Sequence, residues 1–156
     1  MSFNYSQFRR LRNNFAKLSD SYEKWIQSFL LGEATRFMAI VKPLTPVDTG
    51  DLRNHWKIGR IFRQGNTLCV EIINPMEYAT FVEYGHRQTP GRYVPQIGKR
   101  LVNDWVEGAH MMQISMDRIY AEMPSRFNSE FQKWCKGLEV MSWLKNSRVK
   151  KLSPNL

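Results

Sequence analysis

The sequence predicts an α+β fold with N-terminal helices, a small antiparallel sheet containing a hairpin, and a long C-terminal helix kinked near Pro124. Two stretches with apolar residues three and four positions apart predict the helices at the two ends of the chain. Between them, apolar alternation flanked by turn residues predicts the strands. This order of helix, small sheet and helix is typical of an α+β domain.

The N-terminal helical segment is predicted over residues 5–42. Asp20 is followed three residues later by Glu23, as in a capping box. The segment is therefore either a short helix followed by a long one or a single bent helix, and Pro43 and Pro46 are expected to end it. Its apolar stripe consists of Phe8, Leu11, Phe15, Leu18, Tyr22, Trp25 and Phe29.

The sheet region is predicted over residues 56–106. Strand-like stretches at residues 57–63 and 68–73 flank the turn residues Gln64, Gly65 and Asn66, which predicts a β-hairpin. Before this region, Asp48 or Thr49 is expected to cap a short helical turn that runs through Trp56.

After the hairpin, residues 77–84 predict a short helix closed by Gly85. The segment from His86 to Gly98 is rich in glycine, proline and basic residues, and we expect an exposed loop or an extended arm there. A further strand is predicted within residues 99–106.

The C-terminal helical segment is predicted over residues 109–140, where Pro124 is expected to kink or break the helix. Residues 145–156 are basic and are expected to form a flexible tail. Residues 1–144 are accordingly predicted to form a single α+β domain.

The chain carries 23 Lys and Arg against 14 Asp and Glu, a net charge of +9. Such a balance indicates an anionic partner, either nucleic acid or the acidic face of another protein, or else a solvated basic surface. Cys69 and Cys135 match no zinc spacing and no disulfide framework, which is typical of a reducing cytoplasm. Neither a signal peptide nor a membrane span is predicted, so no membrane partner is expected.

An enzyme would need grouped carboxylates or a nucleophile beside a base. The candidates Asp48, Asp51, Glu77, Glu83 and His86 form no known metal spacing. The two aspartates are explained as capping and loop residues, the two glutamates point to different faces of a short helix, and His86 follows a helix C-terminus. The sequence therefore predicts no catalytic, metal or cofactor site.

Basic residues occur in three clusters, at residues 9–12, 86–92 and 145–151. No helix-turn-helix, zinc-finger or RNA-recognition pattern accompanies them. We therefore favour a protein interface formed by the first two clusters and keep DNA contact as the alternative. The predicted interface residues are Arg9, Arg10, Arg12, His86, Arg87, Arg92 and Tyr93.

Two motifs stand in a fixed order, Thr-Pro-Val-Asp-Thr-Gly-Asp-Leu-Arg at residues 45–53 and Tyr-Ala-Thr-Phe-Val-Glu-Tyr-Gly-His at residues 78–86, and Trp105–Gly108 precedes the last helix. Over roughly Ala34 to Leu138 the chain resembles the lambdoid-type phage tail-completion family, whose members are also described as neck or minor tail components. The residues that carry the resemblance as structural motifs are Asp48, Thr49, Gly50, Leu52, Arg53, Tyr78, Glu83 and Gly85.

The resemblance implies a structural virion protein without catalysis, which acts in tail completion and head-to-tail joining by ring assembly. It implies a homo-oligomer, a hexameric ring, with a tail terminator or tail tube protein and head-to-tail connector proteins as partners. Basic residues in the lumen would lie near DNA. The protein would be found in the host cytoplasm during assembly and then in the virion neck or tail. The alternative is a basic DNA-binding accessory protein of phage packaging or assembly.

Overall fold

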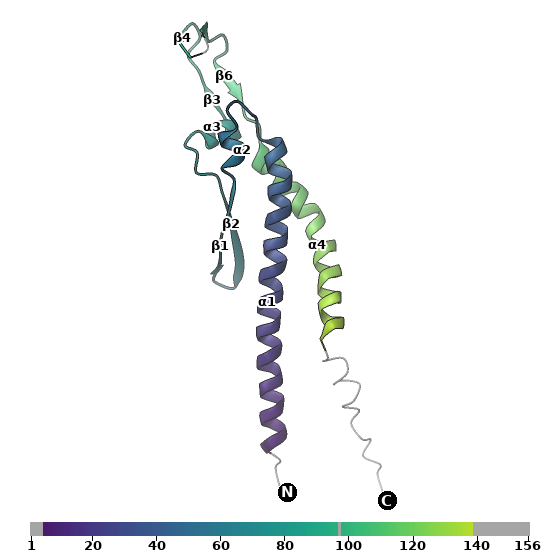
Figure 1. Cartoon of the computed structure of the whole chain (residues 1–156). Coiled ribbons are helices and arrows are strands. Elements are labelled where there is room, and N and C mark those ends of the chain that lie inside the picture. The colour runs from purple at the N-terminus through teal and green to yellow at the C-terminus, as the bar shows by residue number, and fades with distance from the viewer. Residues whose placement is uncertain (1–4, 97, 139–156) are drawn as a thin grey trace, which may run out of the picture. The chain divides into compact units, whose positions relative to one another are not determined.

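A computed structural model describes residues 5–96 and 98–138 (Figure 1). Contacts divide the chain into two compact units, where the sequence predicts one domain over residues 1–144. The helical unit comprises the described parts of residues 1–29 and 122–156, and the mixed unit comprises residues 30–121. The elements in chain order are α1 (Tyr5–Leu44), α2 (Asp51–Asn54), β1 (Lys57–Gln64), β2 (Thr67–Ile73), α3 (Ala79–Tyr84), β3 (Gly85–Arg87), β4 (Tyr93–Val94), β5 (Lys99–Arg100), β6 (Trp105–Glu107) and α4 (Met111–Gly137).

Helices at both ends and short antiparallel strands between them confirm the predicted α+β fold. The N-terminal segment is one continuous helix of 40 residues, so the predicted cap at Asp20 is wrong. The apolar periodicity runs through Asp20 without a gap, and the residue lies exposed inside the helix instead of at its start. The helix also includes Pro43 and ends at Leu44, where the Thr45 N–H donates to the Val41 carbonyl at 3.0 Å.

The helical unit pairs the first part of α1 with the second part of α4 through aromatic rings. Tyr22 contacts Trp134, and Phe29 contacts Phe127, with ring centroids 5.8 and 5.3 Å apart. Because these pairs run in opposite chain order, the two helices are antiparallel. Trp25 lies at the centre and packs on three rings of α4 at 5.4–5.5 Å: Phe127, Phe131 and Trp134.

The core of the mixed unit forms where the second half of α1 meets the residues that follow it. Side chains on one stripe of α1 are buried, because positions three and four apart share a helix face. They are joined by Trp56, whose ring packs edge-on against Phe37 with centroids 6.3 Å apart. The buried apolar residues of this unit are Ala34, Phe37, Val41, Leu52, Trp56, Met111 and Ile119.

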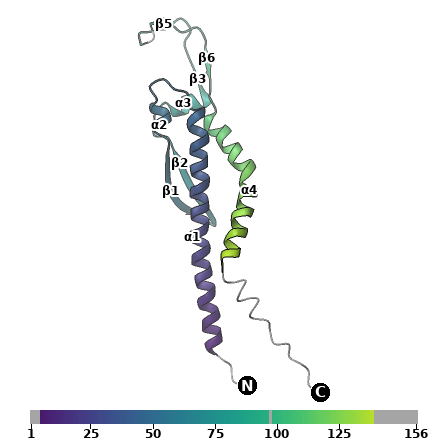
Figure 2. The same ribbon diagram turned by 45° about the vertical axis from the view of Figure 1, so that its right-hand side comes forward.

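The strands form three separate antiparallel pairs. The predicted hairpin is β1 with β2, joined by a two-residue turn at Gly65 and Asn66, and Gly65 has the positive φ (60°) that the first position of a type II′ turn requires. Of the other two pairs, β3 and β4 fall largely in the segment from His86 to Gly98 that is expected to be a loop or an arm, whereas their partners β6 and β5 fall largely within residues 99–106, where a further strand is predicted. We call Gly85–Gly108 the arm; it leads away from α2 and α3 in both views (Figures 1 and 2).

Helix α4 runs from Met111 to Gly137, within the predicted segment 109–140. It passes through Pro124 without ending, so the proline does not break the helix. The predicted flexible tail at residues 145–156 lies outside the described residues. Within residues 5–96 and 98–138, none of the helices combines the length and apolar character that a membrane crossing requires.

Candidate functional site

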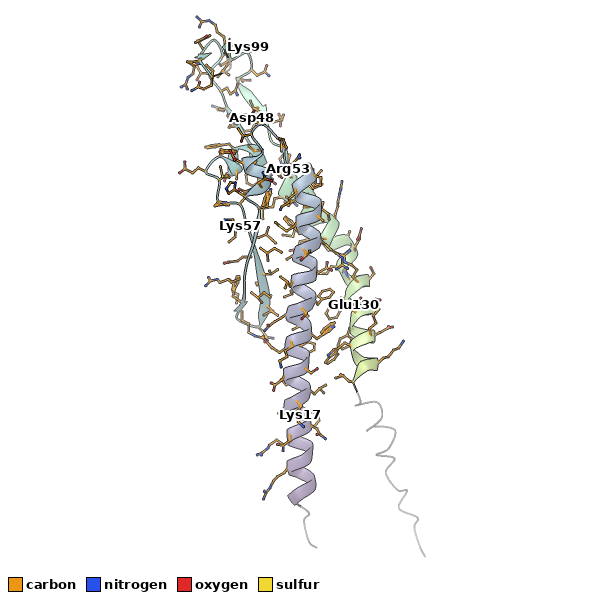
Figure 3. All side chains as sticks on the ribbon, viewed as in Figure 1. Lys17, Asp48, Arg53, Lys57, Lys99 and Glu130 are labelled. Carbon is orange, nitrogen blue, oxygen red and sulfur yellow. The ribbon has the colours of Figure 1, made fainter. Side chains whose placement is uncertain are left out.

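The loop after α1 is fixed by the buried side chain of Thr45, the first residue of the 45–53 motif. Its hydroxyl donates to the Val41 carbonyl at 2.7 Å and accepts the indole N–H of Trp56 at 2.9 Å. The Arg53 guanidinium then donates to the Thr45 carbonyl at 2.9 Å. Arg53, drawn in Figure 3, therefore closes the motif onto its own first residue instead of facing a substrate.

The predicted cap of the short helix is corrected by the structure. Helix α2 begins after Gly50, which has φ +91°, and no side chain caps it in the manner expected of Asp48 or Thr49. The Thr49 hydroxyl instead donates to the Asp51 carboxylate at 2.7 Å and accepts the Asp51 N–H at 3.3 Å. The glycine is required here because a left-handed backbone is strained for other residues.

Asn74 ties this loop to the segment that precedes α3. Its amide donates to the carbonyl of the buried Leu52 at 2.7 Å, and its oxygen accepts the Met76 N–H at 3.2 Å. Asn74 directly follows β2 and precedes Pro75. An asparagine directly after a strand and before proline is a signal for such a turn-forming side chain.

Glu83, in the second motif, has a structural role. The side chain is buried, and its two oxygens accept the backbone N–H groups of Met112 (2.9 Å) and Gln113 (3.0 Å) at the start of α4. The first N–H groups of a helix have no partner within the helix, and a carboxylate there also interacts favourably with the helix dipole. The motif glutamate is therefore an N-terminal cap supplied from a distant part of the chain.

Two glycines let the backbone cross at the base of the arm. Gly85 has φ +82°, and a Cβ placed on it would lie 2.4 Å from the Val106 carbonyl oxygen. A Cβ on Gly108 would lie 2.2 Å from the Glu83 carbonyl oxygen. Backbone hydrogen bonds from the Ala109 N–H to the Val82 carbonyl (2.8 Å) and from the His110 N–H to the Glu83 carbonyl (3.1 Å) complete the junction. The glycine that closes α3 thus also permits the close approach of the two arm strands.

An open pocket of about 430 Å³ lies between the 45–53 motif and α3. Tyr78 lines it and is 40% exposed, so this motif residue faces solvent in the described structure. We call the surface formed by residues 46–52 and 77–84 the groove. The residues that line the pocket are Pro46, Val47, Asp48, Thr49, Gly50, Asp51, Leu52, Tyr78 and Val82.

Most predicted interface residues are exposed. Arg87, Arg92 and Tyr93 are exposed on the arm. His86 is half-buried, with its ring 6.0 Å from the Phe81 ring. Arg9 and Arg12 are exposed on α1 in the helical unit, whereas the side chain of Arg10 lies outside the described residues, as does the basic cluster at residues 145–151.

The candidate catalytic residues are not assembled into a reacting group. Glu83 caps α4, and Asp51 is engaged by Thr49. Over the part of the chain that the structure describes, no three His, Cys, Asp or Glu side chains gather closely enough to hold a metal ion. Glu83 and Asp51 therefore hold the local backbone in place.

The polar residues of the motifs at 45–53 and 78–86 hold the groove and the base of the arm in place. This use of polar residues is typical of a structural protein. Residues 9–85 match the model of a family described as “Bacteriophage HK97-gp10, putative tail-component”. This match confirms the predicted resemblance to a phage tail and neck family, and residues 9–85 are similar to a phage tail component. It covers the motif at 45–53 and ends at Gly85, so the arm beyond Gly85 and α4 lie outside it. Comparisons with curated proteins and with solved structures gave no match.

Proposed function

We propose that this protein acts in tail completion and head-to-tail joining at the neck or tail end of a phage particle. It does so by assembling into a hexameric ring between a tail terminator or tail tube protein and the head-to-tail connector. The observation that carries the proposal is the family match over residues 9–85.

The use of the motif residues supports a structural role. The polar groups of Thr45, Arg53 and Glu83, which an enzyme would direct at a substrate, bond to the backbone of the same chain. They fix the loop after α1, the base of the arm and the start of α4. These hydrogen bonds give the subunit a surface of fixed shape. Repeated assembly needs such a surface, because every copy must present the same contacts.

Ring assembly is supported by the exposed arm and the exposed groove of one chain. A contact between two different surfaces of identical subunits can close into a ring of defined size. Individually weak contacts gain strength when many are engaged at once. The sixfold symmetry of the proposed ring rests on the family resemblance.

Gene deletion with electron microscopy tests the proposal. Cells that lack the gene should accumulate separate heads and tails, and expression of the intact chain should restore joined particles. Immunogold labelling of restored particles should mark one position at the head-proximal end of the tail. Label scattered along the tube, or joined particles without the gene, would contradict the proposal.

A second candidate function is DNA contact by the arm. From Arg87 to Asn103 the arm carries four basic residues and no acidic one, and Tyr93 is exposed among them. A gel shift with duplex DNA should then weaken steeply as salt rises, because each phosphate contact releases counterions. Absence of a shift at low salt removes this candidate.

A further inference from the structure

The arm has no core of its own. None of its described residues, 85–96 and 98–108, is buried. Backbone hydrogen bonds hold its two sides together, from Gln88 to Asp104 at 2.8 Å and between Arg92 and Leu101 at 2.9 Å. An isolated two-stranded ribbon is only marginally stable in water. Packing of its exposed side chains on another surface would therefore stabilise the arm.

The outer part of the arm offers apolar and basic side chains together. Val102 is 84% exposed and Tyr93 is 53% exposed. Arg92 and Lys99 are exposed beside them, and Figure 3 shows Lys99 at the outer end of the arm. Ten residues on each side, at about 3.3 Å per residue, let the ribbon reach up to roughly 30 Å from its base.

The groove has the opposite charge and a similar apolar content. Residues 46–52 and 77–84 contain no Lys or Arg in a chain whose net charge is +9. Asp48, Asp51 and Glu77 are exposed there. Val47 is 52% exposed and Tyr78 is 40% exposed, and both line the pocket of about 430 Å³.

We propose that the arm of one copy docks in the groove of a second copy, with Val102 and Tyr93 on the apolar surface of Val47 and Tyr78 and with Lys99 facing Asp48. This inference rests on the proposed ring assembly and supplies its contact. The partner is a second copy because one chain carries both complementary surfaces. The arm leads away from α2 and α3 of its own chain, so its outer part is free to reach the groove of a neighbour. Duplex DNA would pair with the basic residues alone and would leave the groove and Val102 without a role.

Photo-crosslinking tests the contact directly. Full-length protein with benzoylphenylalanine in place of Val102 is mixed with ¹⁵N-labelled wild-type protein at high concentration, irradiated and digested. The expected product joins an unlabelled arm peptide to a labelled peptide from residues 46–52 or 77–84. Crosslinks to other labelled peptides only, or none between copies, would overturn the proposal.

Charge exchange gives a second measurement. Lys99→Glu and Asp48→Lys should each lower the crosslink yield and the self-association seen by sedimentation velocity by roughly 10-fold, as expected for close interfacial charges. The double variant should recover most of the loss. Lys57→Glu, the same charge change at an exposed residue of β1, serves as the control and should match wild type.

The outcomes separate this inference from the proposed function. If Lys99→Glu weakens DNA binding but leaves crosslinking unchanged, the arm is a DNA contact and the docking proposal fails. Gold label at the tail end together with no crosslink between copies leaves the proposed function standing and overturns the docking. Correct crosslinks with no label on particles would instead overturn the proposed function.

Discussion

Glu83 provides the sharpest test of how the second motif works. Replacing it with alanine removes the acceptor for the Met112 and Gln113 N–H groups and leaves both without a protein partner. Replacing it with glutamine keeps the shape of the side chain but removes its charge. The pair of variants therefore separates the presence of an acceptor from the presence of a carboxylate.

The magnitude follows from the two hydrogen bonds. A hydrogen bond to a charged group contributes about 1.5–3 kcal/mol, and loss of a helix N-cap typically costs about 0.5–2 kcal/mol. Because water enters the space that alanine leaves, we expect a cost of about 3 kcal/mol for Glu83→Ala. For Glu83→Gln we expect about 1.5 kcal/mol, since one amide oxygen can still accept one N–H.

Amide hydrogen exchange at Met112 and Gln113 is the assay, because it reports local opening free energy. In Glu83→Ala these two amides should exchange about 100-fold faster, since 1.4 kcal/mol corresponds to a tenfold change. Glu77→Gln, at an exposed glutamate of the preceding turn, is the control and should change stability by less than about 0.5 kcal/mol. Unchanged protection of both amides in Glu83→Ala would refute the capping role.

Three further predictions concern the arm base and the two cores, each measured by urea unfolding. Gly85→Ala should destabilise the protein by more than about 2 kcal/mol, because its backbone conformation strains any other residue and the new Cβ meets a carbonyl; a neutral change contradicts the crossing. Trp56→Phe should cost about 1 kcal/mol, since the indole bond to Thr45 is lost, and Thr45→Val in the same background should then cost less than it does alone. Trp25→Ala should cost about 3 kcal/mol by removing the ring that contacts three rings of α4, whereas Phe15→Ala, at an exposed site, should cost less than about 0.5 kcal/mol; equal effects would contradict the aromatic core.

Helices, the hairpin and the short helix before Gly85 are predictable because their signals are local. A stripe of apolar residues at three- and four-residue spacing reports one helix face, and Gly65 reports its own turn. The same local signals mislead at Asp20, because a capping pattern matters only where a helix begins. The helix continues through that position because apolar periodicity on both sides outweighs a single polar pair.

The roles of Glu83 and Thr45 are not predictable from spacing. Glu83 bonds to residues 29 and 30 positions away, and Thr45 bonds to Trp56, 11 positions away. Their partners are set by the tertiary fold, so a single sequence shows only a polar residue in a turn or a short helix. The sequence does place both residues in motifs. The structure shows that each of them connects two segments of the chain by hydrogen bonds.

The contacts at the base of the arm explain why the base is held in place while the outer part of the arm lacks a core. Glu83, Gly85 and Gly108 lock the base to the start of α4, so the direction in which the arm leaves the mixed unit is set before any partner binds. A preset direction lowers the entropy cost of docking, because only the outer residues remain to be ordered. An arm without such a base would lose that advantage at every contact of the proposed ring. In the proposed ring, Glu83 and Gly85 of the motif at residues 78–86 therefore serve assembly by setting the direction of the arm, without touching a neighbour themselves.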